Sequence, residues 1–258
     1  MKTNYGNWIS TPMMKTLVAI AAVLYVLTAL YAFIYDRVTA PFFILAILSG
    51  IATLVVLYMY YCRYVFSFEG GGLMRRIHGY LLDHLPWDGL GNALEVGCGS
   101  GALSISAAKR FPLAEIQGID YWPPMWNYGQ PQCEANAAAE GVADRCTFQH
   151  GDAAKLDFPD NHFDAVVSNF VFHEVRTQKD KFLLVEESLR VLKKGGAFAL
   201  HDTFGNRDMY GNMDEFVAYL QEKGIADVSY LPNTEQNIPM PAPVRFMMRG
   251  IGMLYGTK

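Results

Sequence analysis

The chain has 258 residues, of which 52% are hydrophobic and only 18% are charged, and its net charge at pH 7 is −4. Soluble globular domains carry about a quarter charged residues, so part of this chain is expected in a membrane. The acidic balance argues against a nucleic-acid partner, and four cysteines without CxxC spacing argue against a disulfide scaffold.

Two long stretches near the N-terminus, residues 16–35 and 38–62, contain no charged side chain. A helix of 20 residues spans about 30 Å, the thickness of the hydrocarbon core of a bilayer. Because only Asp36 and Arg37 separate the stretches, they predict an antiparallel transmembrane hairpin over residues 16–62. A signal peptide has one shorter apolar run, and a buried hairpin of a soluble protein seldom lacks charges over this length.

Positive charges are denser at the open end of this hairpin than at its tip. The tip carries Arg37, whereas the open end carries Lys2, Lys15, Arg63, Arg75 and Arg76. The positive-inside rule therefore predicts that both termini and the C-terminal domain are cytoplasmic. Residues 1–15 are then a cytoplasmic N-terminus, and a glycine-containing linker at residues 63–74 leads to a domain at residues 75–258.

Helix-like and strand-like segments alternate along that domain. Helical spacing of apolar residues predicts helices over residues 75–85, 102–110, 133–140, 179–192 and 214–223. Short apolar runs predict seven strands at residues 93–96, 115–119, 147–149, 165–168, 197–200, 227–231 and 250–256. Such alternation predicts an α/β fold, in which a parallel sheet is covered by helices on both faces.

A glycine-rich turn, Gly97 to Gly101, follows the strand at residues 93–96 and opens the helix at residues 102–110. Glycines are needed there because the backbone turns sharply and must approach a ligand without a Cβ in the way. The turn alone does not identify the ligand. Gly97, Gly99 and Ala102 also fit the looser dinucleotide fingerprint, which keeps NAD as a rival.

Acidic residues stand at three consecutive strand ends: Glu95 within the first, Asp120 closing the second, and Asp152 after the third. The carboxyl ends of parallel strands meet along one crevice, so these acids are expected close together. There, carboxylates can accept hydrogen bonds from ribose hydroxyls or amines, whereas they repel a diphosphate. The pattern therefore favours a positively charged nucleoside over a dinucleotide.

Five ordered segments resemble the successive motifs of class I S-adenosylmethionine-dependent methyltransferases, with spacing closest to the quinone, sterol and small-molecule branch. They are residues 94–101, 118–120, 151–153, 163–169 and 190–196. The resemblance implies a Rossmann-like, seven-stranded, mostly parallel sheet with an antiparallel last strand and helices on both faces, here preceded by the two-helix transmembrane hairpin. It also implies that the cofactor is S-adenosylmethionine and that the reaction is SN2 transfer of its methyl group.

The resemblance carries over to individual residues. It implies that the cofactor contacts are Glu95, Gly97 and Gly99 for the methionine part, Gly101 in the same turn, Asp120 and Tyr121 for the nucleoside, Asp152 and Ala153 for adenine, and Asn169 in the donor pocket. Glu95 and Asp120 could instead cap helices. The chain departs from the family pattern at residues 121–126, where a helix start is usual, and Trp122, Trp126 and Tyr128 could wall an acceptor pocket there.

His173 and Glu174 follow Asn169 in a loop that faces the reacting methyl group in this fold, so we select them as candidate catalytic residues. Either could take a proton from the acceptor, although His173 could also serve packing alone. His201 and Asp202 end the fifth strand, where hydrogen bonds that fix loops are an equal interpretation. No His, Cys and carboxylate set has metal-ligand spacing, which predicts no metal.

We therefore expect a membrane-anchored methyltransferase whose partners are the lipid bilayer and a small hydrophobic acceptor. The alternatives are a membrane-tethered NAD-dependent oxidoreductase and a non-catalytic module that binds S-adenosylmethionine. Small residues such as Gly50 would also allow two copies to associate through the hairpin, giving a homo-oligomer.

Overall fold

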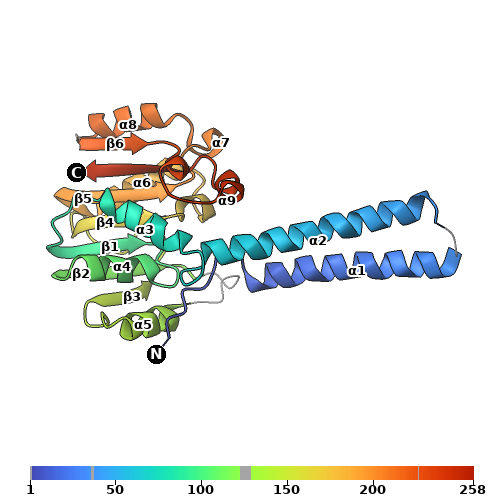
Figure 1. Cartoon of the computed structure of the whole chain (residues 1–258). Coiled ribbons are helices and arrows are strands. Elements are labelled where there is room, and N and C mark those ends of the chain that lie inside the picture. Colours follow the sequence, from blue (N-terminus) through green and yellow to red (C-terminus); the bar gives the residue numbers. More distant parts are fainter. Residues whose placement is uncertain (1, 36–37, 123–128, 226) are drawn as a thin grey trace. The chain divides into compact units, whose positions relative to one another are not determined.

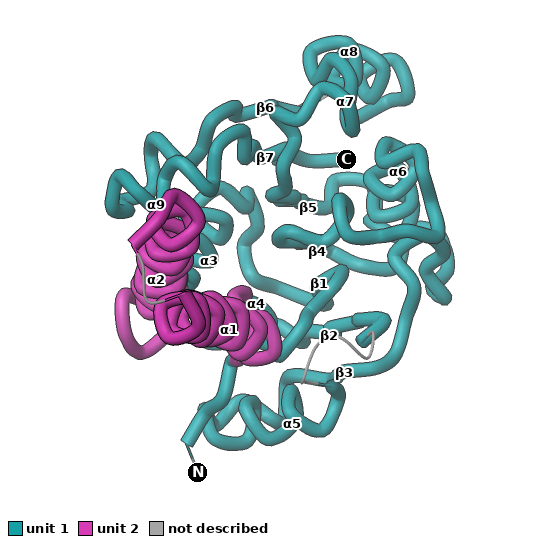
Figure 2. The backbone as a smooth tube through the Cα atoms, turned by 90° about the vertical axis from the view of Figure 1, so that its right-hand side faces the viewer, with its two compact units in different colours: residues 1–5, 74–258 teal, residues 6–73 magenta. Residues whose placement is uncertain are grey.

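The computed structural model describes the chain except residues 1, 36–37, 123–128 and 226 (Figure 1). The chain folds into two compact units (Figure 2). Residues 6–73 form a helical hairpin, and residues 1–5 together with residues 74–258 form an α/β domain. The hairpin is therefore inserted between two parts of one domain.

The hairpin consists of α1 (Thr11–Tyr35) and α2 (Ala40–Phe66). Pro41 lies in the first turn of α2, where its missing N–H group breaks no internal hydrogen bond. By length and composition, both helices could cross a membrane. Most of their large apolar side chains are exposed, as Phe33 and Leu54 illustrate.

Polar side chains of the hairpin bond to one another between the helices. The Tyr25 hydroxyl lies 3.0 Å from Thr53 Oγ1, and Thr28 Oγ1 lies 3.2 Å from Ser49 Oγ. At the open end, the Arg63 guanidinium donates to the Ile9 carbonyl. These hydroxyl groups are thus satisfied inside the pair, while its outer surface is almost wholly apolar.

The α/β domain contains a seven-stranded sheet in the order β3-β2-β1-β4-β5-β7-β6. Its strands are β1 (Gly91–Val96), β2 (Ala114–Asp120), β3 (Cys146–His150), β4 (Phe163–Asn169), β5 (Leu192–Asp202), β6 (Asp227–Leu231) and β7 (Gly252–Thr257). Its α-helices are α3 (Leu73–Asp83), α4 (Ala102–Arg110), α5 (Gln130–Ala139), α6 (Lys181–Arg190), α7 (Arg207–Tyr210), α8 (Met213–Glu222) and α9 (Ala242–Met247). Two 3-10 turns, η1 (Phe172–Glu174) and η2 (Thr234–Gln236), follow β4 and β6.

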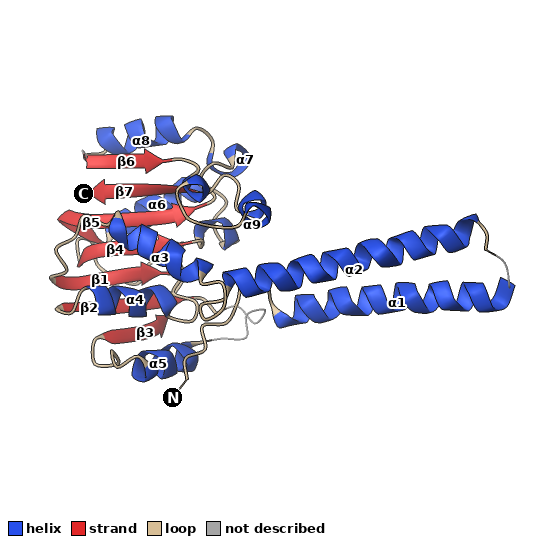
Figure 3. Cartoon of the chain, viewed as in Figure 1, coloured by secondary structure: helices blue, strands red, loops and turns tan. Residues whose placement is uncertain are grey.

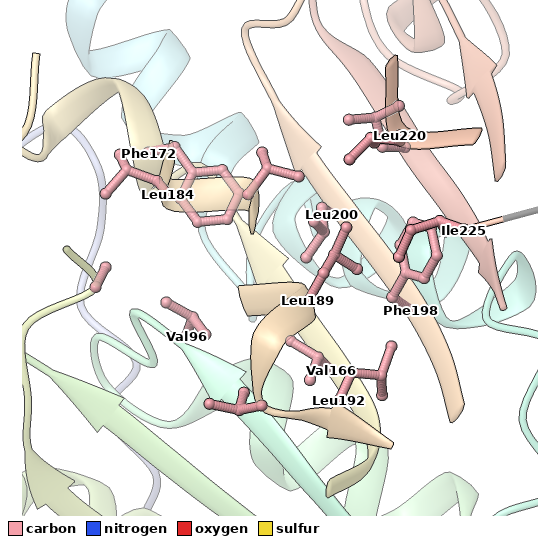
Figure 4. Packing of buried hydrophobic residues seen from close by; sticks show 14 of the residues in the cluster. Val96, Val166, Phe172, Leu184, Leu189, Leu192, Phe198, Leu200, Leu220 and Ile225 are labelled. Atoms are coloured by element: carbon pink, nitrogen blue, oxygen red, sulfur yellow. The ribbon is translucent and has the colours of Figure 1, made fainter. Parts of the chain in front are cut away.

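Alternate residues of the strands form two separate hydrophobic cores because successive side chains point to opposite faces of the sheet. On one face, Val166 and Phe198 pack with α6 and α8 (Figure 4). On the other face, the smaller Ala165 and Ala197 pack in the core that contains residues of α3, α4 and α5. Helices thus cover both faces of the sheet, as Figure 3 shows.

The predicted fold class is confirmed: the sheet of the described residues has seven strands, and β7 runs antiparallel to the other six. Several element bounds differ from the expectation: the hairpin helices begin at Thr11 and end at Phe66 rather than spanning residues 16–62, and most other bounds shift by one to three residues. Strand β5 begins at Leu192 rather than residue 197, because Leu192 pairs with Phe163 before an irregularity in the register. The short helices α7 and α9 were not predicted, since four and six residues are too few to show a helical period.

Candidate active site

The parallel register brings the candidate residues to one edge of the sheet. Val96 pairs with Ile119, so the turn after β1 begins beside the end of β2. Asn169, the last residue of β4, pairs with His201 near the end of β5. The four strand ends thus bring together the glycine turn, Asp120 and Asn169.

The glycine turn depends on backbone conformations that other residues rarely adopt. Gly97, Gly99 and Gly101 have φ angles of 77°, 55° and 79°. A Cβ on Gly97 would lie 2.2 Å from Val171 Cγ2, so the turn also packs directly against the loop after β4. The bare backbone of this turn forms a cradle of the kind that a bound nucleoside derivative requires.

Asp120 connects the second strand to this turn. Its Oδ2 accepts a hydrogen bond from the Gly99 amide at 2.8 Å, and its Oδ1 accepts one from the Trp122 amide at 2.7 Å. Burial raises the pKa of Asp120 above its ordinary value, although these two N–H groups favour the carboxylate. Each oxygen can accept a further hydrogen bond, which fits a pair of ribose hydroxyls.

Glu95 is buried and faces the start of α4. Its Oε2 accepts hydrogen bonds from the Ser104 amide at 2.7 Å and from the Ser104 hydroxyl. Burial raises the pKa of Glu95 to about 8. The structure therefore gives Glu95 the helix-capping contact that the sequence left open, and its contact with the cofactor stays a prediction.

The predicted adenine-binding residues follow β3. Asp152 Oδ1 accepts a hydrogen bond from the Ala154 amide at 2.8 Å, and Ala153 is buried in the core on the α6 face. The exposed Tyr121 ring lies 5.1 Å from the His150 ring, measured between centroids. Trp126 and Tyr128 lie outside the described residues, whereas Trp122 donates from Nε1 to the Gly99 carbonyl at 2.7 Å.

His173 on η1 is held by a buried aspartate at the end of β5. Its Nδ1 lies 2.7 Å from Asp202 Oδ1, while its Nε2 lies 3.5 Å from Glu174 Oε1. Burial by itself would lower the pKa of His173, but the adjacent Asp202 carboxylate outweighs it and the pKa lies above its ordinary value. Because an ionised carboxylate can only accept hydrogen bonds, we assign the ring hydrogen to Nδ1, which leaves Nε2 to exchange a proton.

The sequence places Asp202 at a strand end but does not identify it as a site residue. Its side chain is fully buried and also accepts from the Phe172 amide at 2.8 Å and the Thr203 amide at 2.6 Å. Burial would raise the pKa of Asp202, but these donors and His173 hold it below its ordinary value. A fixed negative charge thus lies behind the His173 ring.

Next to this pair, His201 fixes Asn169. His201 Nδ1 lies 3.1 Å from Asn169 Oδ1, and Nε2 lies 2.7 Å from Thr234 Oγ1. Burial lowers the pKa of His201 to about 4, so the ring is neutral at physiological pH. Because His201 occupies the amide oxygen of Asn169, the amide nitrogen is left as the group that can donate to a ligand.

Comparisons with known proteins agree with this arrangement. A family model described as a methyltransferase domain matches residues 94–200. The demethylmenaquinone methyltransferase of Thermus thermophilus is 30% identical over 168 residues, which cover 62% of this chain and 72% of that protein. The enzyme of the same name from Listeria monocytogenes is 29% identical over 175 residues, covering 64% of this chain and 70% of that protein.

A solved structure shares the fold. Haemonchus contortus phosphoethanolamine N-methyltransferase 2, solved in complex with S-adenosyl-L-methionine, superposes with a TM-score of 0.55. The match is 17% identical and covers 73% of this chain and 53% of that one. At this identity the likeness shows the fold alone.

The buried Glu95 carboxyl predicts a pH-dependent stability. Its folded pKa of about 8 exceeds the ordinary value of 4.5, so the folded state keeps a proton that the unfolded state has released. The free energy of unfolding should therefore fall as pH rises between these values, by up to about 1.4 kcal/mol per pH unit. Glu95→Gln should remove this slope in thermal unfolding at pH 5.5, 6.5 and 7.5.

The exposed carboxylate of Glu115 on β2 provides the matched control. Glu115→Gln should keep the slope of the parent protein. An unchanged slope in Glu95→Gln would contradict the raised pKa.

Proposed function

Because the chain belongs to the class I S-adenosylmethionine-dependent methyltransferases of the quinone type, we propose that it methylates a small hydrophobic acceptor dissolved in a lipid bilayer. The observation that carries this proposal is that the glycine turn and the His173–Asp202 pair lie at the same edge of the sheet. The same chain carries two helices that are long enough to cross a membrane. The relatives named demethylmenaquinone methyltransferase support a quinol-type ring as acceptor.

S-adenosylmethionine, the methyl donor, would be held by the residues that the sequence indicates. Backbone from Gly97 to Gly101 would cradle the methionine part, and Asp120 would accept from the ribose hydroxyls. Asp152 and Ala153 follow β3, where the adenine would lie. Glu95, Tyr121 and Asn169 complete the set that we assign to the donor pocket. When bound, S-adenosylmethionine supplies an electrophilic methyl group on a sulfonium, and transfer leaves a neutral thioether.

On the acceptor side, we assign His173 as general base and Asp202 as its positioning residue. Nδ1–H donates to Asp202, which leaves Nε2 to take the proton of an acceptor hydroxyl. Asp202 stabilises the resulting imidazolium because it is a buried, ionised carboxylate. Asn169 can donate from its amide nitrogen to the oxygen that has lost the proton. The acceptor's nucleophilic atom would form a bond to the methyl carbon while the bond from that carbon to the sulfonium sulfur breaks, and the sulfur keeps the electron pair.

The hairpin would place the enzyme where such an acceptor is dissolved. Its outer surface carries exposed apolar side chains, whereas polar groups such as Tyr25 and Thr53 bond to each other between α1 and α2. Lipid cannot satisfy hydroxyl groups, so this division fits a bilayer. The excess of Lys and Arg at the open end favours a two-pass topology with both termini cytoplasmic. Self-association through the hairpin stays a prediction.

Methyl transfer to a membrane-dissolved acceptor is the direct test. The full chain in phosphatidylethanolamine–phosphatidylglycerol vesicles that contain chemically reduced demethylmenaquinone should move label from methyl-tritiated S-adenosylmethionine into the quinone fraction. His173→Ala should lower kcat about 100-fold through loss of the base. His162→Ala, at an exposed histidine, is the control. Absence of labelled quinone with the parent protein would contradict the assigned acceptor class.

The Asp202–His173 pair predicts a shift of the pH–rate profile. The base must be neutral, so the rate should rise with pH through the raised pKa of His173. Asp202→Asn removes the charge that raises this pKa, so the rise should move to lower pH while the plateau falls at least about tenfold. Asp208→Asn, at an exposed aspartate of α7, should leave the profile unchanged. If the rising part of the pH–rate profile does not shift in Asp202→Asn, Asp202 has no positioning role.

We expect Asp120 to determine how tightly the methyl donor binds. Asp120→Ala removes both the proposed ribose contact and the bond that holds the Gly99 amide. Calorimetry with S-adenosylhomocysteine should show binding to the parent protein and none to this variant at the same concentrations. Equal affinities would exclude Asp120 from the donor site.

A further inference from the structure

The residues that precede the hairpin belong to the α/β domain. We define residues 2–5 as the N-terminal arm. The arm is part of the same compact unit as residues 74–258, although 68 residues of hairpin unit, residues 6–73, separate the two in sequence. Its partners in that unit are α5 and the glycine turn.

A buried asparagine on α5 binds the arm through a paired contact. The Asn4 amide donates to Asn136 Oδ1 at 2.8 Å, and Asn136 Nδ2 donates to the Asn4 carbonyl at 2.9 Å. The side chain of Asn136 thereby pairs with the backbone of Asn4 as a neighbouring strand would. Asn136 is 1% exposed, so water cannot replace these bonds without a cost.

The same asparagine also binds the glycine turn. Asn136 Nδ2 donates to the Ser100 carbonyl at 3.0 Å. Ser100 in turn donates from Oγ to the Tyr5 carbonyl at 2.9 Å. Ser100 lies between Gly99 and Gly101, so the arm, Asn136 and the glycine turn form one closed network of hydrogen bonds.

Tyr5 anchors the arm by its side chain as well. Its ring packs against the core formed with α4 and α5, and its hydroxyl donates to Glu140 Oε1 at 3.3 Å. The arm is therefore tied to the domain at two successive residues, through backbone at Asn4 and through backbone and ring at Tyr5.

We propose that the N-terminal arm and Asn136 are positioning elements of the donor site, which hold Ser100 and thereby the glycine turn in its cofactor-binding conformation. The inference rests on the proposed donor site. The turn contains three glycines with left-handed φ angles, so its backbone has much conformational freedom to lose when the cofactor binds. Bonds that order the turn beforehand remove that cost from the binding step. The hairpin is thus an insertion into the cofactor-binding domain rather than an extension in front of it.

Two variants of the full chain test the proposal from opposite sides of the contact. Asn136→Ala removes the bonds to Asn4 and Ser100, whereas Asn4→Pro removes the amide donor in the arm and keeps the backbone carbonyl that accepts from Asn136. Asn92→Ala, an equivalent truncation at an exposed position at the start of β1, is the control. The measurements are calorimetric Kd for S-adenosylhomocysteine, and kcat and KM for S-adenosylmethionine.

Asn136→Ala and Asn4→Pro should each raise Kd and the donor KM by about tenfold, as expected for one or two lost hydrogen bonds. Since the arm does not contact His173 or Asp202 among the described bonds, kcat at saturating donor should stay within about twofold. A purely structural role would lower the melting temperature without this split between KM and kcat. The control should bind as the parent does.

Asp120→Ala distinguishes a failure of the arm's positioning role from a failure of the proposed donor site. If Asp120→Ala abolishes binding while Asn136→Ala and Asn4→Pro bind as the parent does, the arm has no positioning role and the donor site stands. If Asp120→Ala also binds as the parent does, the donor site itself is wrongly assigned and the proposal falls with it.

Discussion

The hydrogen bond from the Gly99 amide to Asp120 joins the glycine turn to the end of β2, the two parts of the proposed donor site. It forms because β1 and β2 pair in parallel, so the turn that follows β1 lies against the last residue of β2. The glycine turn is also bound by Trp122 and by Asn136, and each bond fixes a different part of its backbone. The register of two parallel strands is thus the constraint from which the geometry of the crevice follows.

On the proposed acceptor side, the end of β5 holds the site residues in place. His201 and Asp202 are adjacent and both buried, yet burial has opposite consequences for them. His201 stays neutral and fixes the Asn169 amide, whereas Asp202 stays ionised because His173 and two backbone amides donate to it. The end of β5 therefore supplies a neutral group that orients the last residue of β4 and a negative charge beside η1.

The sequence predicted most of the fold because its signals are local. Apolar runs located all seven strands, and the ordered motifs placed Asp120, Asp152 and Asn169 at strand ends. It did not predict what depends on pairing between distant segments. Nothing in the local pattern around Asn4 or Asn136 indicates that they bind each other, and the pairing of His173 with Asp202 requires the β4–β5 register. Glu95 shows a further limit of prediction from sequence, since a carboxyl group at a strand end could equally cap the next helix or contact a ligand.

The central claim is that the crevice binds S-adenosylmethionine in a chain that works at a bilayer. The most direct measurement is calorimetry of the full chain in lipid nanodiscs with S-adenosylmethionine, S-adenosylhomocysteine and NAD in parallel. We expect saturable binding of the first two and none of NAD, because the Asp120 and Asp152 carboxylates at neighbouring strand ends disfavour a diphosphate. Binding of NAD without S-adenosylhomocysteine would contradict it.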